Sequence, residues 1–338
     1  MAPAVMNAVV MHSPGDPGVL HVVRLPVPRP GPDQVLVRVH AAAVSTLDLS
    51  IRSGTATVDL PLLPGSDGAG EVILVGPGVT EWSPGDRVVA ISGTMGRTRS
   101  GGYADYVVVP AAELHAIPDN VSFISSTSVG RAFSTAWTAI FHNGRLGMNE
   151  RVVVVGAADA IGIAAVQICR WKGSRVIAVS HGRHAQRLAA LGATRVVSRS
   201  APDLAEHVKA GFGGQGAAVV VQVVDSALGP SVEMLDQNGR LVLTSGGRPQ
   251  LLDVRQVVNK QAHLIGSTAH IDAVDIHQVL KLLSEATFLP VIDSIYPLSK
   301  VGEAHRRAES EMTFGAVLLV PDHLYRSAEE RTQLLEED

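Results

Sequence analysis

The sequence predicts an α/β protein that combines a doubly wound parallel sheet with an N-terminal β domain of barrel type. Between residues 123 and about 270, short apolar strands alternate with helical patterns, an order that produces a parallel sheet with right-handed crossovers. Residues 1–122 instead carry short β patterns separated by Gly-Pro and Pro-Gly turns, which is typical of barrels. Hydrophobic residues make up 46% of the chain and aromatic residues only 4%. The core must therefore be built from Val, Ala, Leu and Ile, which favours α/β layers with buried parallel strands.

The elements follow in order along the chain. The β patterns of the first part are MNAVVMH, VLHVVRLP, QVLVRVHAAAV, GEVILVG, DRVVAI and YADYVVVP. The strands of the second part are VVVVG, RVIAVS, RVVS, AAVVVQVV, RLVLTSG and HLIGS, and its helices include 161–172, 184–191, 202–211 and 229–236. The remainder predicts a helix at about 273–286, a strand VIDSIYPL, a helix at 299–309, a strand GAVLLV and a charged tail at 322–338.

Composition excludes several classes of protein. The chain has 338 residues, enough for two domains, and a net charge of −4, which argues against a nucleic-acid partner. No uncharged apolar run approaches the roughly 20 residues that span a bilayer, and no secretory signal is visible, so we expect a cytoplasmic protein without a membrane partner. The single cysteine, Cys169, excludes a disulfide framework within the chain and a multi-cysteine zinc site. Its place in a predicted helix indicates a small core residue.

The segment 152–162, VVVVGAADAIG, is the most informative stretch. A buried strand that runs through a glycine turn into a helix is how α/β proteins hold a pyrophosphate. The outer glycines, Gly156 and Gly162, are present, but Asp159 and Ala160 stand where such turns usually have small, uncharged residues. A carboxylate repels a phosphate, and an added Cβ narrows the approach. The segment therefore predicts a dinucleotide site and also weakens the case for it.

Several short motifs together carry a family resemblance. They are PGSDGAG (64–70), GDRV (85–88), GGYADY (101–106), TAW (135–137), LGA (191–193), GRLV (239–242) and FG (314–315). In this order and spacing, over about residues 5–321, the chain resembles the medium-chain dehydrogenase/reductases, and most closely the zinc-independent quinone oxidoreductases and related enoyl reductases. The resemblance implies a GroES-like catalytic domain at 1–122, completed by about 271–338, and a Rossmann dinucleotide-binding domain at 123–270.

Zinc is not expected. Zinc alcohol dehydrogenases of this family carry a Cys in the segment matching 43–48 and a Gly-His-Glu matching 65–67. This chain has Ser45 in the first segment and Gly-Ser-Asp in the second, with Ser66 in place of the histidine. Catalytic zinc requires about three N, S or carboxylate ligands that converge on one point. The two serines cannot supply them, and no HxxxH or HExxH pair occurs among the 13 histidines.

The same segment supplies the candidate catalytic residues. In the quinone oxidoreductase branch it reads Ala-Val-Asn-Pro-x-Asp, and the Asn and Asp face the nicotinamide and substrate. Here Ser45 takes the Asn position and Asp48 keeps the Asp. Asp48 either holds a hydroxyl or water, or is a helix-capping carboxylate at the start of 49–52. Tyr103 is a candidate proton donor, with a packed loop tyrosine as the alternative.

The second strand of the dinucleotide unit indicates the type of cofactor. NAD enzymes generally place an acid at its end to bind the ribose hydroxyls. This chain has Ser180, then Arg183 and Arg187 one turn later, and no acid. Two guanidiniums suit a 2′-phosphate, so NADP(H) is expected over NAD(H), unless the arginines are only a solvated helix face. With the resemblance, the expected cofactor contacts are Thr135, Gly156, Ala157, Ala158, Ile161, Gly162, Ser180, Arg183, Arg187, Ser245, Gly246, Gly266 and Ser267.

Two classes of function stay open at this point. The first is a zinc-independent, NADPH-dependent reductase of a quinone or activated alkene (an enone or enoyl compound), with the enolate stabilised by Ser45 or by backbone amides. The second is a degenerate family member with weak or no use of NADPH, which catalyses a non-redox step such as a cyclisation or only binds a small molecule. Besides Asp159 and Ala160, four departures from the family pattern favour the second: Arg131, Phe133, Gln222 and Ala316.

The sequence says less about the identity of the substrate and about the oligomeric state than about the cofactor. The substrate pocket would be built largely from the variable loops 92–100 and 244–275, so the motifs do not identify the small molecule. Family members commonly pair the edge strands of two Rossmann sheets, and 262–270, AHLIGSTAH, is a plausible apolar edge. A homodimer is therefore expected.

Overall fold

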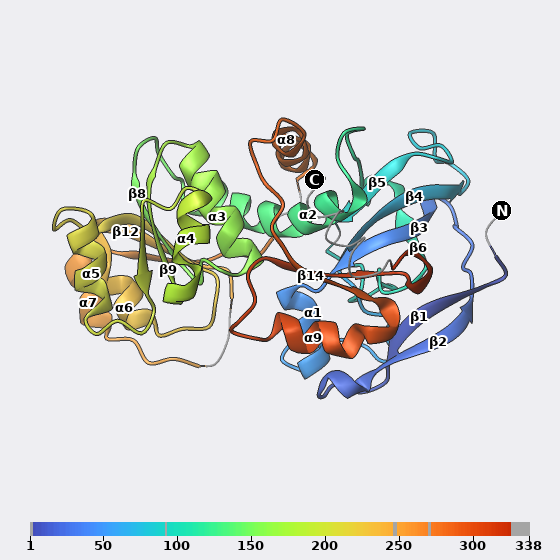
Figure 1. The fold of residues 1–338 in the computed structure, drawn as a ribbon, viewed down its shortest axis with the longest axis horizontal. Coiled ribbons are helices and arrows are strands. Elements are labelled where there is room, and N and C mark those ends of the chain that lie inside the picture. The colour runs from blue at the N-terminus through green and yellow to red at the C-terminus, as the bar shows by residue number, and fades with distance from the viewer. Residues whose placement is uncertain (1–2, 92, 246–248, 270–271, 326–338) are drawn as a thin grey trace. The chain divides into compact units, whose positions relative to one another are not determined.

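A computed structural model describes residues 3–91, 93–245, 249–269 and 272–325 (Figure 1). The chain divides into two compact units, 1–131 together with 271–338, and 132–270. The division at 131/132 falls inside the helix α2 (Phe123–Trp137), later in the chain than the predicted boundary at 122/123. From residue 271 onward the chain belongs to the first unit.

The first unit is built on a mostly antiparallel sheet. Its seven strands run in the order β14-β15-β3-β4-β5-β7, with β6 paired to β3, and a separate hairpin joins β1 to β2. The strand β15 pairs with β3 through Leu318 and Ala43, so the C-terminal segment joins the N-terminal sheet. The strands are β1 (Val5–Met11), β2 (Leu20–Pro26), β3 (Gln34–Ala43), β4 (Asp67–Val75), β5 (Arg87–Ile91), β6 (Tyr106–Pro110), β7 (Leu114–Ala116), β14 (Ile292–Pro297) and β15 (Ala316–Val320). Its helices besides α2 are α1 (Thr46–Ser53), α8 (Ala273–Ser284) and α9 (Val301–Ala308).

The second unit confirms the predicted doubly wound sheet. Six strands, all parallel to their neighbours, run in the order β10-β9-β8-β11-β12-β13. Counted from the first strand of this unit, that order is 3-2-1-4-5-6, the arrangement of Rossmann dinucleotide-binding sheets. The strands are β8 (Arg151–Val155), β9 (Arg175–Ser180), β10 (Arg195–Ser198), β11 (Ala217–Gln222), β12 (Leu235–Leu243) and β13 (His263–Gly266). The helices are α3 (Ala160–Trp171), α4 (Ala185–Ala190), α5 (Leu204–Gly211), α6 (Leu228–Glu233) and α7 (Val254–Lys260).

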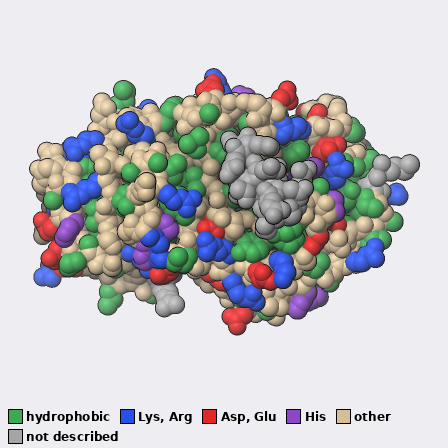
Figure 2. All heavy atoms as spheres, in the orientation of Figure 1, with side chains coloured by type: hydrophobic (Ala, Val, Ile, Leu, Met, Phe, Trp, Pro, Cys, Tyr) green, Lys and Arg blue, Asp and Glu red, His purple; other side chains and the backbone are tan. Residues whose placement is uncertain are grey.

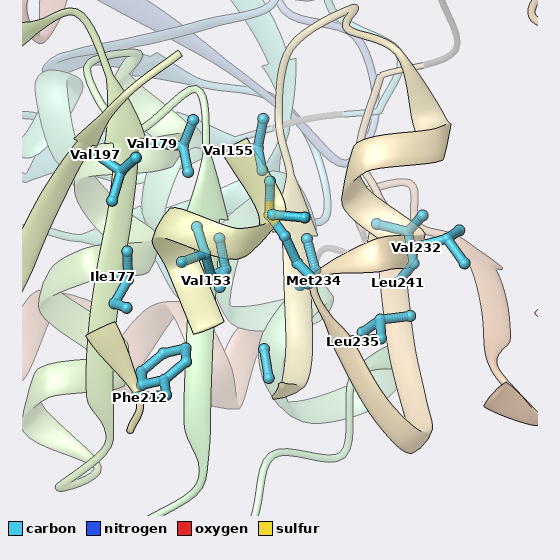
Figure 3. Packing of buried hydrophobic residues seen from close by; sticks show 14 residues of the cluster. Val153, Val155, Ile177, Val179, Val197, Phe212, Val232, Met234, Leu235 and Leu241 are labelled. Carbon is cyan, nitrogen blue, oxygen red and sulfur yellow. The ribbon is translucent and has the colours of Figure 1, made fainter. Parts of the chain in front are cut away.

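The strands of the second unit are held in place by an aliphatic core. Val153 and Val155 of β8 pack in one cluster with Ile177 and Val179 of β9 (Figure 3). Val220 of β11 belongs to the same cluster, and each of these residues is at most 6% exposed. Burying one such side chain contributes about 1.5–3 kcal/mol. Because alternate residues of one strand point to opposite faces, the unbroken apolar runs read from the sequence mark strands covered on both faces.

The charged side chains at the surface and the burial of Cys169 are consistent with what the composition predicts. Lys, Arg, Asp and Glu side chains are interspersed over the face drawn in Figure 2. Within the described residues, no helix has the length and apolar character needed to cross a membrane. Cys169 is fully buried in α3, and burial raises the pKa of its thiol. The interpretation as a small core residue is supported.

Candidate functional site

The glycine turn after β8 has the shape that a phosphate site requires. Gly156 has φ of 88°, and a Cβ on it would lie 2.6 Å from a methyl carbon of Val224. At Gly162 a Cβ would lie 2.3 Å from the carbonyl oxygen of Gly156. A side chain at Gly162 would push α3 away from the turn after β8, and one at Gly156 would be strained at its positive φ and would collide with Val224. Both glycines therefore hold the helix N-terminus close to the end of the strand, as dinucleotide sites need.

Asp159 occupies the N-cap of α3. Its backbone is extended (φ −67°, ψ 154°), and its Oδ1 accepts a hydrogen bond of 2.9 Å from the backbone N of Ile161. Burial raises the pKa of Asp159 to about 6, and backbone hydrogen bonds from Ile161 and Gly162 offset part of that rise. An incoming pyrophosphate would use these same N–H groups. The carboxylate therefore stands in the place that the phosphates would take.

The end of β9 carries the candidate 2′-phosphate contacts. Ser180 is the last residue of β9 and is buried. Arg183 lies in a short 3-10 helix, Gly182–His184, and Arg187 lies in α4; both are exposed. His181 follows the strand, so no acid stands at this end. The placement allows a phosphate contact and is equally that of a solvated helix face.

Two further strands end at, or directly before, a buried polar residue. Gln222 ends β11 and is buried, and its amide is held locally, with Nε2 donating to the carbonyl of Ser226 at 2.7 Å and Oε1 accepting from Ser231 Oγ at 2.7 Å. Gly266 ends β13, and Ser267, which follows it, is buried. In parallel sheets these carboxyl ends are where ligands bind.

Ser267 is held by a residue that sequence reasoning missed. The side chain of Asn143 donates to Ser267 Oγ at 2.9 Å, while the backbone N of Ser267 donates to the carbonyl of Leu243 at 2.8 Å. Asn143 ends a π-helical segment, Thr138–Asn143, a rare form that often occurs at functional sites. No motif in the sequence pointed to it.

The remaining expected cofactor contacts are spread over the second unit. Thr135 and Ala157 are buried, Ala158 and Ile161 are partly buried, and Ser245 is exposed after β12. Gly246 lies outside the described residues. The structure thus brings Gly156, Ala157, Ser180, Gln222, Ser245, Gly266 and Ser267 to the carboxyl ends of the parallel strands.

A separate polar cluster lies in the first unit, at the N-terminus of α1. Ser45 is the N-cap, and it forms a capping box with Asp48. The backbone N of Asp48 donates to Ser45 Oγ at 3.2 Å, and the backbone N of Ser45 donates to Asp48 Oδ2 at 2.9 Å. Asp48 thus has a capping role, one of the two roles that the sequence left open, but α1 begins at Thr46, so Ser45 is the N-cap and Asp48 is the third residue of the helix rather than the cap before 49–52.

Ser66 completes the enclosure of Asp48. Its backbone N donates to Asp48 Oδ1 at 3.0 Å and its Oγ to Oδ2 at 3.1 Å, while Ser45 Oγ donates to Oδ2 at 2.5 Å. The two serine oxygens are 2.8 Å apart. Each hydroxyl has one proton, and both protons are directed into this triangle. Asp48 is fully buried, and burial raises its pKa, which the hydrogen bonds from Ser45 partly offset.

Next to this triangle lies an ion pair. Asp67 is 2% exposed, and its Oδ1 accepts from the backbone N of Ala43 at 3.0 Å. Arg131 of α2 has an 11% exposed side chain, with Nε 3.9 Å from Asp67 Oδ2 and Nη2 donating to the carbonyl of Ser66 at 2.8 Å. Burial raises the pKa of Asp67 to about 7, against the lowering effect of Arg131. Sequence reasoning noted Arg131 only as an unexpected charge.

Tyr103 is packed in the interior of the first unit rather than exposed at its surface. It is fully buried; its hydroxyl donates to the carbonyl of Ala43 at 3.4 Å, and its ring meets His305 edge-on at 5.8 Å between centroids. Desolvation raises the pKa of Tyr103 well above its ordinary value, and the charges of Asp48 and Asp67 raise it further. A phenol with so high a pKa is a weak proton donor. The geometry favours the packed-loop alternative.

Comparison with protein families gives two matches. Residues 31–119 match the family model described as the alcohol dehydrogenase GroES-like domain, and residues 160–285 match the one described as zinc-binding dehydrogenase. The quinone oxidoreductase of Homo sapiens is 31% identical over 310 residues, covering 89% of this chain and 93% of the relative. That of Sus scrofa is 30% identical over 312 residues with the same coverage.

Solved structures are similar over most of this chain. An NAD-dependent alcohol dehydrogenase gives a TM-score of 0.88 at 34% identity, covering 93% of this chain and 99% of that one. The quinone oxidoreductase of Coxiella burnetii gives 0.81 at 26% identity, covering 94% and 99%. A mycobacterial protein solved as a complex with NADPH gives 0.83 at 27% identity, covering 94% and 100%.

The donor set of this chain does not fit the zinc in the name of the second family model. Where zinc relatives carry a Cys and a His, the structure has two serine hydroxyls that bind a carboxylate. The guanidinium of Arg131 lies against the same segment, and a fixed cation disfavours a dication beside it. Among the described residues, no group of three or more His, Cys, Asp or Glu could hold a metal ion.

Proposed function

Because the chain belongs to the medium-chain dehydrogenase/reductase superfamily, we propose that it is a zinc-independent, NADPH-dependent reductase of a quinone or an activated alkene. The observation that carries the proposal is the intact turn between β8 and α3, where Gly156 and Gly162 each occupy a place that a Cβ would fill. The quinone oxidoreductases among the relatives support the oxidoreductase class and the type of substrate.

The second unit would hold the dinucleotide at the carboxyl ends of its strands. The backbone N–H groups of Ile161 and Gly162 would bind the pyrophosphate at the N-terminus of α3, in competition with Asp159. The exposed Ser245 follows β12 and Ser267 follows β13, at the edge of the sheet where a nicotinamide ribose would be bound.

The choice of NADP(H) over NAD(H) rests on the end of β9. Ser180 and the exposed Arg183 and Arg187 supply donors and positive charge, and no acid stands there to bind two ribose hydroxyls. A guanidinium binds a phosphate through paired N–H groups. One relative is named NAD-dependent and another was solved with NADPH, so this preference is a property to be measured on the chain itself.

The chemistry asked of the protein is orientation and charge stabilisation. Bound NADPH would supply a hydride to the electrophilic carbon of the substrate, and a proton from water would complete the reduction. Ser45 is the residue expected to stabilise the substrate oxygen, but its proton is directed to Asp48 or Ser66. We therefore assign Ser45 and Asp48 a positioning role, in which they hold the N-terminus of α1 against the segment at Ser66.

A homodimer remains part of the proposal. The strand β13 ends the sheet of the second unit, so its outer edge would pair with a second copy. Apolar side chains are exposed nearby in the sequence, at Leu264 (38%), Val254 (65%) and Val258 (67%). Exposed apolar side chains of this kind are expected beside an interface.

The test is a titration of the purified protein with NADPH and with NADH, followed by fluorescence, and then an assay of quinone and enone reduction. Binding of NADPH at micromolar concentration, tighter than NADH, together with consumption of NADPH in the presence of a quinone, is the expected result. If neither dinucleotide binds at millimolar concentration, the reductase proposal is wrong. The non-redox alternative, which the position of Asp159 favours, then takes its place.

A further inference from the structure

The end of the π-helical segment Thr138–Asn143 is held by its own hydrogen bonds. The backbone N of Gly144 donates to the carbonyl of Ala139, five residues back, at 2.8 Å. A Cβ at Gly144 would lie 2.8 Å from that same oxygen, so a larger residue would disturb the turn. The segment packs against β12. These contacts place the amide of Asn143 where it donates to Ser267 Oγ at 2.9 Å.

The hydroxyl of Ser267 has a proton to spare. Its oxygen accepts the hydrogen bond from Asn143, and a hydroxyl carries one proton that it can donate elsewhere. Among the residues that the structure describes, none accepts a hydrogen bond from this hydroxyl. Ser267 is 5% exposed, and buried polar groups nearly always have a partner. Ser267 is therefore oriented as a donor towards a group that the described residues do not supply.

A second hydroxyl with unused capacity stands at the neighbouring strand end. Thr244 follows β12, and its Oγ1 is buried without a hydrogen bond to any described residue. The two strand ends are joined, because the backbone N of Ser267 donates to the carbonyl of Leu243 at 2.8 Å. This edge is open: Ser245 and Gly266 are exposed, and a Cβ on Gly266 would meet no described atom within 4 Å apart from its chain neighbours. Two such hydroxyls suit a ligand that carries several donors and acceptors.

The strand order indicates which half of a dinucleotide would lie at this edge. The adenosine ribose would be bound at the end of β9, and the pyrophosphate at the N-terminus of α3, which follows β8. The strand β9 lies on one side of β8, whereas β11, β12 and β13 lie on the other. A dinucleotide bound along the carboxyl edge therefore brings its nicotinamide half to β12 and β13.

We infer that Asn143 is a positioning residue for the cofactor. By donating to Ser267 Oγ, it directs the Ser267 proton towards the nicotinamide half of the bound dinucleotide. An amide in this place keeps Ser267 a donor to the ligand, whereas a carboxylate would accept the Ser267 proton itself. The inference rests on the proposed function, because it requires that a dinucleotide binds, and it adds the residue that sets the direction of this contact.

The experiment measures Kd for two ligands. NADPH has both halves, whereas 2′,5′-ADP has the adenosine and its 2′-phosphate but no nicotinamide. The single variants are Asn143→Asp, Asn143→Ala and Ser267→Ala, and each Asn143 change is also made in the Ser267→Ala background. Asn149→Asp is the matched control, because it adds the same charge at an exposed residue of the same stretch of chain. Thermal unfolding shows which variants are folded, and Asn143→Ala serves if Asn143→Asp is not.

We expect Asn143→Asp and Ser267→Ala each to weaken NADPH binding by about three- to tenfold, the range that one hydrogen bond supplies. Asn143→Ala should weaken it less, because the Ser267 hydroxyl can still turn to the ligand. In the Ser267→Ala background neither change at residue 143 should cost more than about twofold, because the two residues act through one contact. Kd for 2′,5′-ADP should stay within about twofold of the parent in every variant, since sites without a shared contact act independently. Asn149→Asp should behave as the parent does with both ligands.

A loss from Asn143→Asp that is as large in the Ser267→Ala background as in the parent overturns the inference, because residue 143 would then act through its charge or through the fold. An equal weakening of 2′,5′-ADP, or an unchanged NADPH affinity in Asn143→Asp, overturns it as well. Failure of the proposed function would appear in the parent itself, as no binding of NADPH at millimolar concentration, and this inference would fall with it.

Discussion

Replacing Asp159 is the sharpest test of the dinucleotide site. The carboxylate caps α3 through the N–H of Ile161, where the pyrophosphate would bind. Asp159→Asn keeps an oxygen acceptor at the cap and removes only the charge, whereas Asp159→Gly removes both. We expect both variants to bind NADPH more tightly than the parent.

The magnitude follows from the position of the carboxylate. Two unit charges about 4 Å apart repel by about 1 kcal/mol in water and about 4 kcal/mol at an effective dielectric constant of about 20. Asp159 is partly exposed, so the lower value applies. A gain of about 1 kcal/mol corresponds to about fivefold in Kd. Loss of the cap in Asp159→Gly costs only a few tenths of a kcal/mol of stability, so the fold should survive.

The dependence of NADPH affinity on salt and on pH shows whether Asp159 acts through its charge or through its shape. Raised ionic strength should narrow the gap between the parent and Asp159→Asn, because screening weakens the repulsion. Burial raises the pKa of Asp159 from 3.8 to about 6, so the parent should approach the affinity of Asp159→Asn as the pH falls through about 6. Comparing the two proteins at each pH cancels the ionisation of the ligand's own phosphates.

The same pKa shift predicts an effect on folding. Between pH 3.8 and about 6 the folded protein holds a proton on Asp159 that the unfolded chain releases, so this residue's contribution to stability falls as the pH rises through that window. Asp159→Asn should remove the fall, measured as Tm at pH 5 and pH 8. Unchanged or weaker NADPH binding by both variants, at low and high salt, would refute this account of the turn.

Four further outcomes follow from the structure. Replacing Arg183 and Arg187 together by Ala should reduce a preference for NADPH over NADH of at least tenfold, about 1.4 kcal/mol, while Arg170→Ala on the exposed end of α3 leaves it intact; equal Kd values for the parent would contradict the assignment. Metal analysis of the purified protein should find less than stoichiometric zinc, and one tightly bound zinc per chain would defeat the zinc-independent proposal. Light scattering should give a dimer mass at micromolar concentration that Leu264→Lys shifts towards the monomer; a monomeric parent would argue against the paired edge. Burial lowers the pKa of His305 from 6.5 to about 3, so its contribution to stability rises as the pH rises through that window; His305→Leu should move the midpoint of acid unfolding to lower pH, and an unchanged midpoint would show that another group controls it.

Local patterns in the sequence predicted most of the second unit. The unbroken valine run of β8 and the glycines after it gave the start of the dinucleotide unit, and the predicted helix at 161–172 is the observed Ala160–Trp171. These elements depend on short-range periodicity and on backbone geometry that only glycine allows. The capping box at α1 was also readable, because a serine followed three residues later by an acid is its signature.

Contacts between distant segments were not readable. The helix α2 contains a run of serines and Gly130, which have modest helix propensity, and it forms because it packs on the sheet; a Cβ at Gly130 would lie 3.0 Å from Ile91. Arg131 therefore looked like an isolated charge in the sequence. Only the fold brings it to Ser66 and Asp67, more than sixty positions away along the chain. The contact of Asn143 with Ser267 was hidden for the same reason.

The places where the family pattern fails are also the places where charge has changed. Asp159 adds a carboxylate where phosphates would bind, and Arg131 adds a guanidinium to a segment that holds a metal in zinc relatives. Departures from local rules at such positions are more often functional than accidental. Because Asp159 lies in the unit 132–270, dinucleotide affinity is its direct readout, and the Asp159 variants test the turn after β8 without involving the residues of the first unit.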